Sequence, residues 1–320
     1  MGEVVPILRT HLFRGIAVGL VVASLSFIVV HLTKGDTALE IAIARYNIDI
    51  TNESLVEQIR VEEKLDQSLL IQYGRWIGHT FTFDFGHSLV SNEKVTNLLW
   101  YHFRYTLILS ATAMLISLVI ALPLGIVCGM HPGSVLDNIS GLMSSALVAV
   151  PHFITGVLLI LVFAIQLQWF PVAGFFTPSH LLLPAVTLGI GLAAFSNRVI
   201  ATAIVNVRSA AFYQFARMKG LTESRVLLHH GIKNASIPVI TYIGLQTAHL
   251  LDGVLVVETL FAWPGIGKLI LDSILARDIP VIQGASLFIG LVYVFINATV
   301  DLICIALDPC RNTTETSQWE

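Results

Sequence analysis

Long stretches without charged side chains constrain this sequence more than any other feature. Three segments contain no Asp, Glu, Lys or Arg at all: residues 105–136, 138–197 and 279–300. A helix needs about 20 consecutive apolar residues to cross the hydrocarbon core of a bilayer, which is roughly 30 Å thick. The three segments are therefore long enough for one, two and one membrane-spanning helices respectively.

The composition agrees with a membrane protein and argues against several other classes. Hydrophobic residues make up 55% of the chain and charged residues 12%, whereas a soluble domain usually carries about 25% charged residues. A net charge of −3 gives no reason to expect nucleic acid as a partner. Cys128, Cys304 and Cys310 show no paired spacing, so we predict neither a disulfide framework nor a zinc site.

We predict an all-α integral membrane protein with about six transmembrane helices. The first expected span follows Arg9 and Arg14 and resembles a signal sequence, but it is long for one and has no small-residue cleavage site. We therefore expect it to remain uncleaved. Pro151 is expected to kink the third span. The predicted spans are residues 13–32, 105–130, 139–167, 181–203, 236–257 and 281–306.

Basic residues in the loops predict the orientation of the chain. Residues 204–235 contain five Lys or Arg and a single acid, Glu223, so we expect this loop in the cytoplasm. Alternation of the spans then places both termini in the cytoplasm and residues 33–104 outside, as a subdomain that either shields the outer mouth or docks a partner. The expected organisation is a cytoplasmic tail at 1–12, the first span at 13–32, the extracytoplasmic subdomain at 33–104, a five-helix core at 105–306 and a cytoplasmic tail at 307–320.

The cytoplasmic loop carries the most informative local pattern. Residues 212–219 are predicted to form a short helix that ends at Gly220, because glycine readily adopts the left-handed conformation found at helix C-termini. Thr222 is expected to start a second helix, from Glu223 to about His230. Such a loop could either contact a partner protein or rest on anionic lipid. Three apolar side chains of the first helix are expected to project away from the spans: Phe212, Phe215 and Met218.

The chain lacks an energy-coupling motif of its own. The segment closest to a phosphate-binding loop is Trp263–Lys268, but Ala262 replaces the first glycine and Leu269 replaces the Ser or Thr. Neither a zinc-protease helix nor a nucleophile elbow is present in the sequence. We therefore do not expect an enzyme.

Several segments resemble those of a known family, the permease subunits of ABC importers. Residues 216–221 (Ala-Arg-Met-Lys-Gly-Leu), followed by 230–238 (His-Gly-Ile-Lys-Asn-Ala-Ser-Ile-Pro), resemble its cytoplasmic coupling loop. The resemblance covers nearly the whole chain and is closest to the first permease of the dipeptide, oligopeptide and nickel importers. Further matching segments follow in the family's order: 35–36, 65–69, 72–73, 84–88, 183–185, 261–267, 277–283 and 307–309.

The resemblance implies a complex in the bacterial inner membrane. Its other members would be a second homologous permease, two ATP-binding subunits and an extracytoplasmic binding protein, and membrane lipid would surround the permeases. This chain would bind no cofactor, because ATP and Mg belong to the partner subunits. Two positions depart from the family pattern, since Gln214 and Ala201 stand where Arg is usual. The residues expected to couple to the ATP-binding subunit are Gln214, Ala216, Arg217, Lys219 and Gly220.

We predict nickel or a nickel or other transition-metal chelate as the substrate, because residues 35–40 and 261–268 resemble the nickel permeases more than the peptide permeases. The alternative is a dipeptide or oligopeptide importer, and a secondary transporter that works without ATP is less favoured.

Polar residues inside the spans give candidates for the translocation path. Gln246, His249 and Asp252 follow at steps of three and share one helix face, and His152 lies in the third span. Imidazole and carboxylate suit a divalent metal, so His249 and Asp252 are candidate transient metal ligands. A hydrogen bond from His249 to Asp252 or to a neighbouring helix is the alternative. For His152 the alternative is a buried histidine that binds a carbonyl group.

Overall fold

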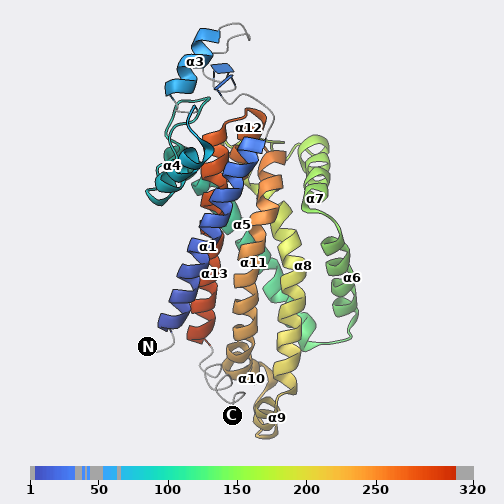
Figure 1. The fold of residues 1–320 in the computed structure, drawn as a ribbon. Helices are drawn as coiled ribbons and strands as arrows, with labels where there is room; N and C mark the ends of the chain where they lie inside the picture. The colour runs from blue at the N-terminus through green and yellow to red at the C-terminus, as the bar shows by residue number, and fades with distance from the viewer. Residues whose placement is uncertain (1–3, 33–37, 40–41, 44–52, 63–65, 308–320) are drawn as a thin grey trace. The chain divides into compact units, whose positions relative to one another are not determined.

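The computed structural model describes residues 4–32, 38–39, 42–43, 53–62 and 66–307 (Figure 1). The regular elements in these ranges are helices, apart from one antiparallel bridge between His87 and Lys94. The first helices are α1 (Val4–Leu32), α3 (Glu53–Glu62), α4 (Leu69–Phe81), α5 (Val95–Met130), α6 (Val135–Ala149) and α7 (His152–Leu159), followed by the π-helical η1 (Ile160–Gln166). The remainder are α8 (Ser179–Ser209), α9 (Ala211–Met218), α10 (Glu223–Val226), the π-helical η2 (Leu227–Gly231), α11 (Ile232–Leu260), α12 (Ile266–Leu275) and α13 (Ile279–Leu307).

Three described helices are long and apolar enough to cross a membrane: α5, α8 and the part of α13 from Ile279 to Ile303. The bent pair formed by α6 with α7 and η1 makes a fourth candidate. An all-helical membrane fold is thus confirmed, with three or four candidate spans in the described part of the chain. The predicted number of six is higher than this count and stays a prediction, although α1 and α11 each extend over 29 residues.

The third predicted span, residues 139–167, is broken near its middle, and the bend is much sharper than the kink that we expected at Pro151. The chain bends by 102° between α6 and α7. Val150 has the extended backbone angles φ −93° and ψ 122°, which is the conformation that a following proline favours. Pro151 therefore breaks the helix rather than merely kinking it.

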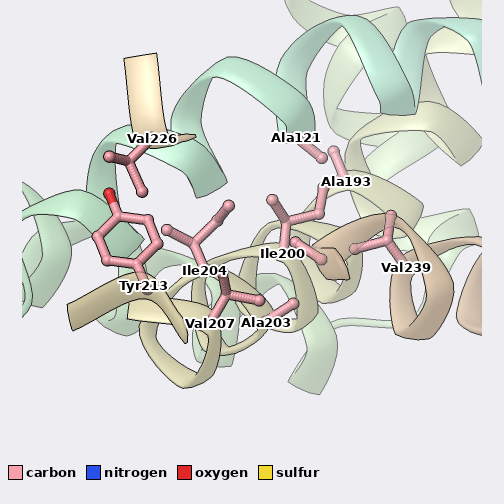
Figure 2. Packing of buried hydrophobic residues seen from close by; sticks show 10 residues of the cluster. Ala121, Ala193, Ile200, Ala203, Ile204, Val207, Tyr213, Val226 and Val239 are labelled. Carbon is pink, nitrogen blue, oxygen red and sulfur yellow. The ribbon is translucent and has the colours of Figure 1, made fainter. Parts of the chain in front are cut away.

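The chain divides into two compact units. One comprises Met1–Thr106 with Pro264–Phe295, and the other Leu107–Trp263 with Ile296–Glu320. A core of the first unit contains Ala23, Phe85, Val95, Leu99, Leu269, Val281, Ala285 and Leu287. In the second unit, buried residues of α5, α8, α9, α10 and α11 pack together (Figure 2).

A buried carboxylate in the first unit joins two segments far apart in the sequence. Asp278, which precedes α13, accepts a hydrogen bond from the Ser88 hydroxyl through Oδ2. Its Oδ1 accepts one from the Leu89 backbone N–H at 3.1 Å. Two of the family-like segments, 84–88 and 277–283, therefore meet at this carboxylate.

Glycines allow α5 and α8 to approach closely in the second unit. A Cβ atom at Gly125 would lie 2.9 Å from the carbonyl oxygen of Asn197, and one at Gly129 would lie 2.7 Å from Cβ of Ile204. Real side chains do not tolerate such distances, and small residues at helix contacts are typical of membrane proteins.

Candidate functional site

The loop after α8 is held in place by Arg208, which lies in the last turn of that helix. Its Nη1 donates to the carbonyl oxygens of Met130 at 2.6 Å and Gly129 at 3.4 Å, at the C-terminal end of α5. Its Nη2 donates to Oε1 of Glu223, the first residue of α10, at 2.8 Å. The last carbonyl groups of a helix have no intrahelical partner, and a cation near them is favourable. One guanidinium therefore links α5, α8 and α10.

Helix α9 has a buried side and an exposed apolar side. Tyr213 is buried and packs in the cluster that also contains Val207 and Val226 (Figure 2). Phe212, Phe215 and Met218 are exposed, and Met218 shows 78% of its surface. All three side chains are thus exposed, but Phe212 also lines a groove with residues of α8 and α11. Their projection away from the spans stays a prediction. Because exposed apolar residues gathered on one short helix favour contact with another surface, α9 is a candidate interface.

The predicted turn after α9 is also confirmed. Gly220 has φ +84°, and its N–H donates to the carbonyl of Arg217 at 2.9 Å. Thr222 adopts the extended conformation of a helix start, although its side chain makes no capping hydrogen bond. The second helix begins at Glu223 as expected and continues through η2 to Gly231.

The five predicted coupling residues lie together on this loop. Gln214 donates from Nε2 to the Arg208 carbonyl at 3.0 Å, so it satisfies a group at the C-terminal end of α8. Arg217 forms an ion pair with Glu223 at 3.5 Å, and the Lys219 ammonium lies 4.6 Å from the centre of the Phe215 ring. Gly220 provides the turn, and the half-buried Ala216 packs against the core cluster.

A groove of about 520 Å³ lies beside this loop, between α8, α9 and α11. Its walls include Thr202 and Asn206 of α8, Phe212 of α9 and Pro238 of α11. The exposed surface of α9 is therefore continuous with a depression in the second unit.

Polar side chains join α6 to α8 in the membrane-spanning part. Arg198 donates to Oδ1 of Asp137 at 2.7 Å, and the Gly133 N–H donates to the other carboxylate oxygen at 3.0 Å. The buried Asn197 donates from Nδ2 to the hydroxyls of Ser140 and Ser144. Its Oδ1 has no hydrogen-bond partner among the residues that the structure describes.

The candidate path residues differ in what the structure says of them. Gln246 is 4% exposed, accepts from the Ser196 hydroxyl at 2.8 Å and donates to the Leu192 carbonyl at 3.1 Å. Both amide atoms thus bind α8. The side chains of His249 and Asp252 lie outside the described part of the structure, which records only their helical backbone in α11.

His152 opens α7 and fills space that two glycines leave free. A Cβ atom at Gly191 of α8 would lie 2.6 Å from Nδ1 of His152, and one at Gly253 of α11 would lie 3.1 Å from Cδ2. The half-buried imidazole is therefore packed between two helices. Among the described residues, no group of three or more His, Cys, Asp or Glu is arranged to hold a metal ion.

The sequence analysis missed two residues that stand out in the structure. Glu258 is fully buried in α11. An acidic residue in an apolar stretch, one residue beyond the predicted end of the fifth span, is the sequence signal that could have identified it. Arg208 was counted only as one of five basic residues in the loop, and no local pattern revealed its partners.

Comparisons with known proteins agree on one family. Residues 121–311 match the family model described as "Binding-protein-dependent transport system inner membrane component". The glutathione transport system permease protein GsiC of Salmonella paratyphi A is 36% identical over 290 residues, which cover 91% of this chain and 93% of that protein. GsiC of Escherichia coli (strain K12) is 36% identical over 289 residues, with 90% and 93% covered.

Solved structures show the same fold at low sequence identity. An inward-facing structure of the MetNI methionine ABC transporter aligns with a TM-score of 0.55 and 17% identity over 66% of this chain and 96% of that one. A chain of an amino acid ABC transporter with histidines aligns with a TM-score of 0.53 and 16% identity, covering 66% of this chain and 94% of its own length. These two similarities concern the fold alone.

Proposed function

This chain belongs to the binding-protein-dependent transport system inner membrane component family, and on that premise we propose that it forms half of the translocation path of an importer for peptide-like solutes. As a member of this family it is a multi-pass inner-membrane permease of an ABC importer and a non-catalytic subunit. ATP is hydrolysed by the partner ATPase subunits, and the system also includes a binding protein and a partner permease.

The observation that carries the choice of substrate is the similarity to glutathione permeases over about nine-tenths of the chain. Glutathione is a small peptide, so this similarity favours the peptide alternative over nickel. The described residues add no support for nickel, since they contain no cluster of metal-binding side chains. The predicted metal role of His249 and Asp252, whose side chains lie outside the described residues, is not part of the proposal.

The proposed topology keeps six spans, both termini in the cytoplasm and residues 33–104 outside, before a core at 105–306. It is supported by the contact between Arg208 and the carbonyl of Met130, which brings the C-terminal ends of α5 and α8 together. Two helix ends meet on one side of a membrane when the chain between them crosses once outward and once back. The broken segment formed by α6, α7 and η1 then supplies the outward crossing and α8 the return.

The proposed role of the loop around α9 is to contact the ATP-binding subunit. The support is its construction, in which a buried Tyr213 and the Arg208–Glu223 pair fix a short helix whose other side is apolar and exposed. Basic residues Arg217 and Lys219 flank this surface. A surface fixed in this way can transmit a displacement of its partner to α5 and α8.

The path proposal now centres on His152, His249 and Asp252. Ionisable side chains inside a span are costly and usually face a polar pathway, and a peptide offers ammonium and carboxylate groups for them to bind. Gln246 fits the interhelical interpretation better, because α8 engages both its amide atoms. Single His249→Ala and Asp252→Asn variants should lower peptide uptake. Unchanged uptake by an assembled complex would remove them from the path.

The direct test of the proposed function is uptake of radiolabelled glutathione and of a radiolabelled dipeptide by cells that express the complete transporter. We expect uptake to depend on this chain, on ATP and on the binding protein. Excess Ni²⁺ should not inhibit this uptake. Nickel uptake that ignores excess peptide would contradict the substrate proposal while leaving the family intact.

The loop is tested by replacing Met218 with Ser and measuring co-purification of the ATP-binding subunit and peptide-stimulated ATP hydrolysis. Phe176→Ser is the matched control, because Phe176 is equally exposed but lies in the segment between η1 and α8. We expect both readouts to fall in Met218→Ser and to persist in the control. Equal behaviour of the two variants argues for a lipid-facing loop.

A further inference from the structure

Helix α4 has one face bound to α1 in the first compact unit. The indole Nε1 of Trp76 donates to the carbonyl of Ala23 at 3.0 Å, and the hydroxyls of Tyr73 and Ser24 are 2.7 Å apart. The ring of Tyr73 also meets the ring of Phe27 edge to face, with centres 5.3 Å apart. These contacts fix the level of α4 along α1 (Figure 1).

That level lies within an apolar segment of α1. The contact residues fall inside the apolar stretch Phe13–Ile28, and no Asp, Glu, Lys or Arg occurs between Arg14 and Lys34. Exposed apolar side chains flank the contact on both sides, with Val21 before it and Ile28 after it. Because the proposed topology makes α1 the first span, a helix bound at this level lies beside the hydrocarbon layer and not in bulk water.

The opposite face of α4 is uncharged and open. Leu70, Gly74 and Gly78 follow at steps of four and therefore lie in one stripe, with Ile71 beside its start. Leu70 shows 84% of its surface, and Ile71 is also exposed. A Cβ atom at Gly74 or Gly78 would meet no atom within 4 Å. We call Leu70, Ile71, Gly74 and Gly78 the α4 stripe.

The charged groups of α4 lie at one edge of the stripe and at the end of the helix. Arg75 is half-buried and donates to the side-chain oxygen of Gln67. His79, near the C-terminal end, lies 3.6 Å from the carboxylate of Asp84. Such a distribution, with apolar residues on one face and polar groups at the edge and end, is typical of a helix that lies in a membrane interface.

We propose that α4 lies in the outer leaflet of the bilayer, with the α4 stripe against the lipid acyl chains. Lipid is the occupant because α4 is bound at the level of exposed apolar side chains of α1, which a bilayer has to cover. Tyr73 and Trp76 suit this position, since both are enriched at the membrane–water interface. The extracytoplasmic segment is thus anchored by a lipid contact in addition to its covalent links, and this conclusion does not depend on which solute the importer carries.

The test places a fluorescent label at residue 70 in the assembled transporter, reconstituted into phosphatidylcholine–phosphatidylglycerol vesicles. Leu70→Cys is made in a chain whose Cys128, Cys304 and Cys310 are replaced by alanine. The matched control is Glu57→Cys, because Glu57 is an exposed residue of α3 in the same compact unit. Quenching is measured with nitroxide-bearing lipids and, separately, with aqueous iodide.

We expect lipid-borne nitroxides to quench the label at 70 several-fold more strongly than the label at 57, and iodide to show the reverse order. A Gly74→Cys label should behave like the label at 70, which guards against a local effect of replacing leucine. Strong iodide quenching at 70 would overturn the proposal. The proposal would also be overturned if iodide quenches the label at 70 until binding protein is added. The stripe would then be a protein-docking surface.

Discussion

Arg208 and Glu223 form an ion pair with 2.8 Å between Nη2 and Oε1, and the same guanidinium binds the last carbonyl groups of α5. The position of the cytoplasmic loop is therefore fixed by a helix that ends almost eighty residues earlier in the chain. Replacement of Arg208 should therefore remove contacts of both α5 and the loop.

The two members of this pair should differ in their effect on stability. Glu223→Gln removes two partly exposed ion pairs, with Arg208 and with Arg217, and each contributes at most about 1 kcal/mol. Arg208→Ala also removes charged hydrogen bonds to two carbonyl groups, and one such bond contributes about 1.5–3 kcal/mol. In thermal unfolding of the detergent-solubilised complex, Arg208→Ala should thus have a clearly lower unfolding temperature than Glu223→Gln. Arg225→Ala, at an exposed position of the same loop, is the control, and equal losses in all three would contradict the linking role.

Gly220→Ala tests the turn between α9 and α10. A left-handed backbone costs roughly 1–2 kcal/mol for an L-residue with a side chain, and no neighbour would contact the added methyl group. The expected result is weaker peptide-stimulated ATP hydrolysis with a small loss of unfolding temperature. Gly220→Asn should be milder, because asparagine tolerates this conformation. If alanine and asparagine are equally harmful, backbone conformation is not the cause.

Gly129→Ala tests the close contact between α5 and α8. Its Cβ would lie 2.6 Å from the carbonyl of Ala201, and overpacking of this kind costs typically about 1–3 kcal/mol. We expect a lower unfolding temperature and a lower yield of assembled complex. Gly78→Ala is the matched control, because the surroundings of Gly78 are open, and a comparable loss there would refute the packing argument.

Asp278→Ala tests the buried carboxylate of the first unit. It leaves the Leu89 N–H and the Ser88 hydroxyl without their acceptor, and each buried unsatisfied group costs about 1–3 kcal/mol. Asp278→Asn should lose less, because one carbonyl oxygen remains to accept. The control Asp272→Ala removes only an exposed pair with Lys268 on α12. In limited proteolysis and thermal unfolding, the control should be nearly as stable as the wild type. Asp278→Ala should be cleaved fastest and should have the lowest unfolding temperature.

Local chemistry accounts for the features that the sequence could predict. The end of α9 follows from the conformational freedom of Gly220, and the break before α7 follows from Pro151, so each signal lies within a few residues of its effect. The absence of charge over long segments likewise predicts membrane helices without any knowledge of their neighbours. Hydropathy does not report the direction of a helix axis, so the proline predicts a kink within residues 139–167 but not the size of the 102° bend.

Contacts between distant segments could not be predicted in the same way. Arg208 finds its partners on α5, Asp278 finds Ser88, and Gln246 finds Ser196. Each pair depends on which helices lie side by side, and no periodicity in the sequence contains that information. Gln246 is an example. Its position on a helix face predicts a place on the translocation path, whereas its amide group forms hydrogen bonds to Ser196 and Leu192 of α8.

His152 packs in the space left by Gly191 and Gly253, so these three positions share a fixed volume. The consequence is genetic. A larger residue at 191 should be tolerated only when the residue at 152 becomes smaller, and a selection for revertants of Gly191→Ala should yield second-site changes at 152. Substitutions at these positions, which belong to α7, α8 and α11, are therefore expected to arise in compensating combinations.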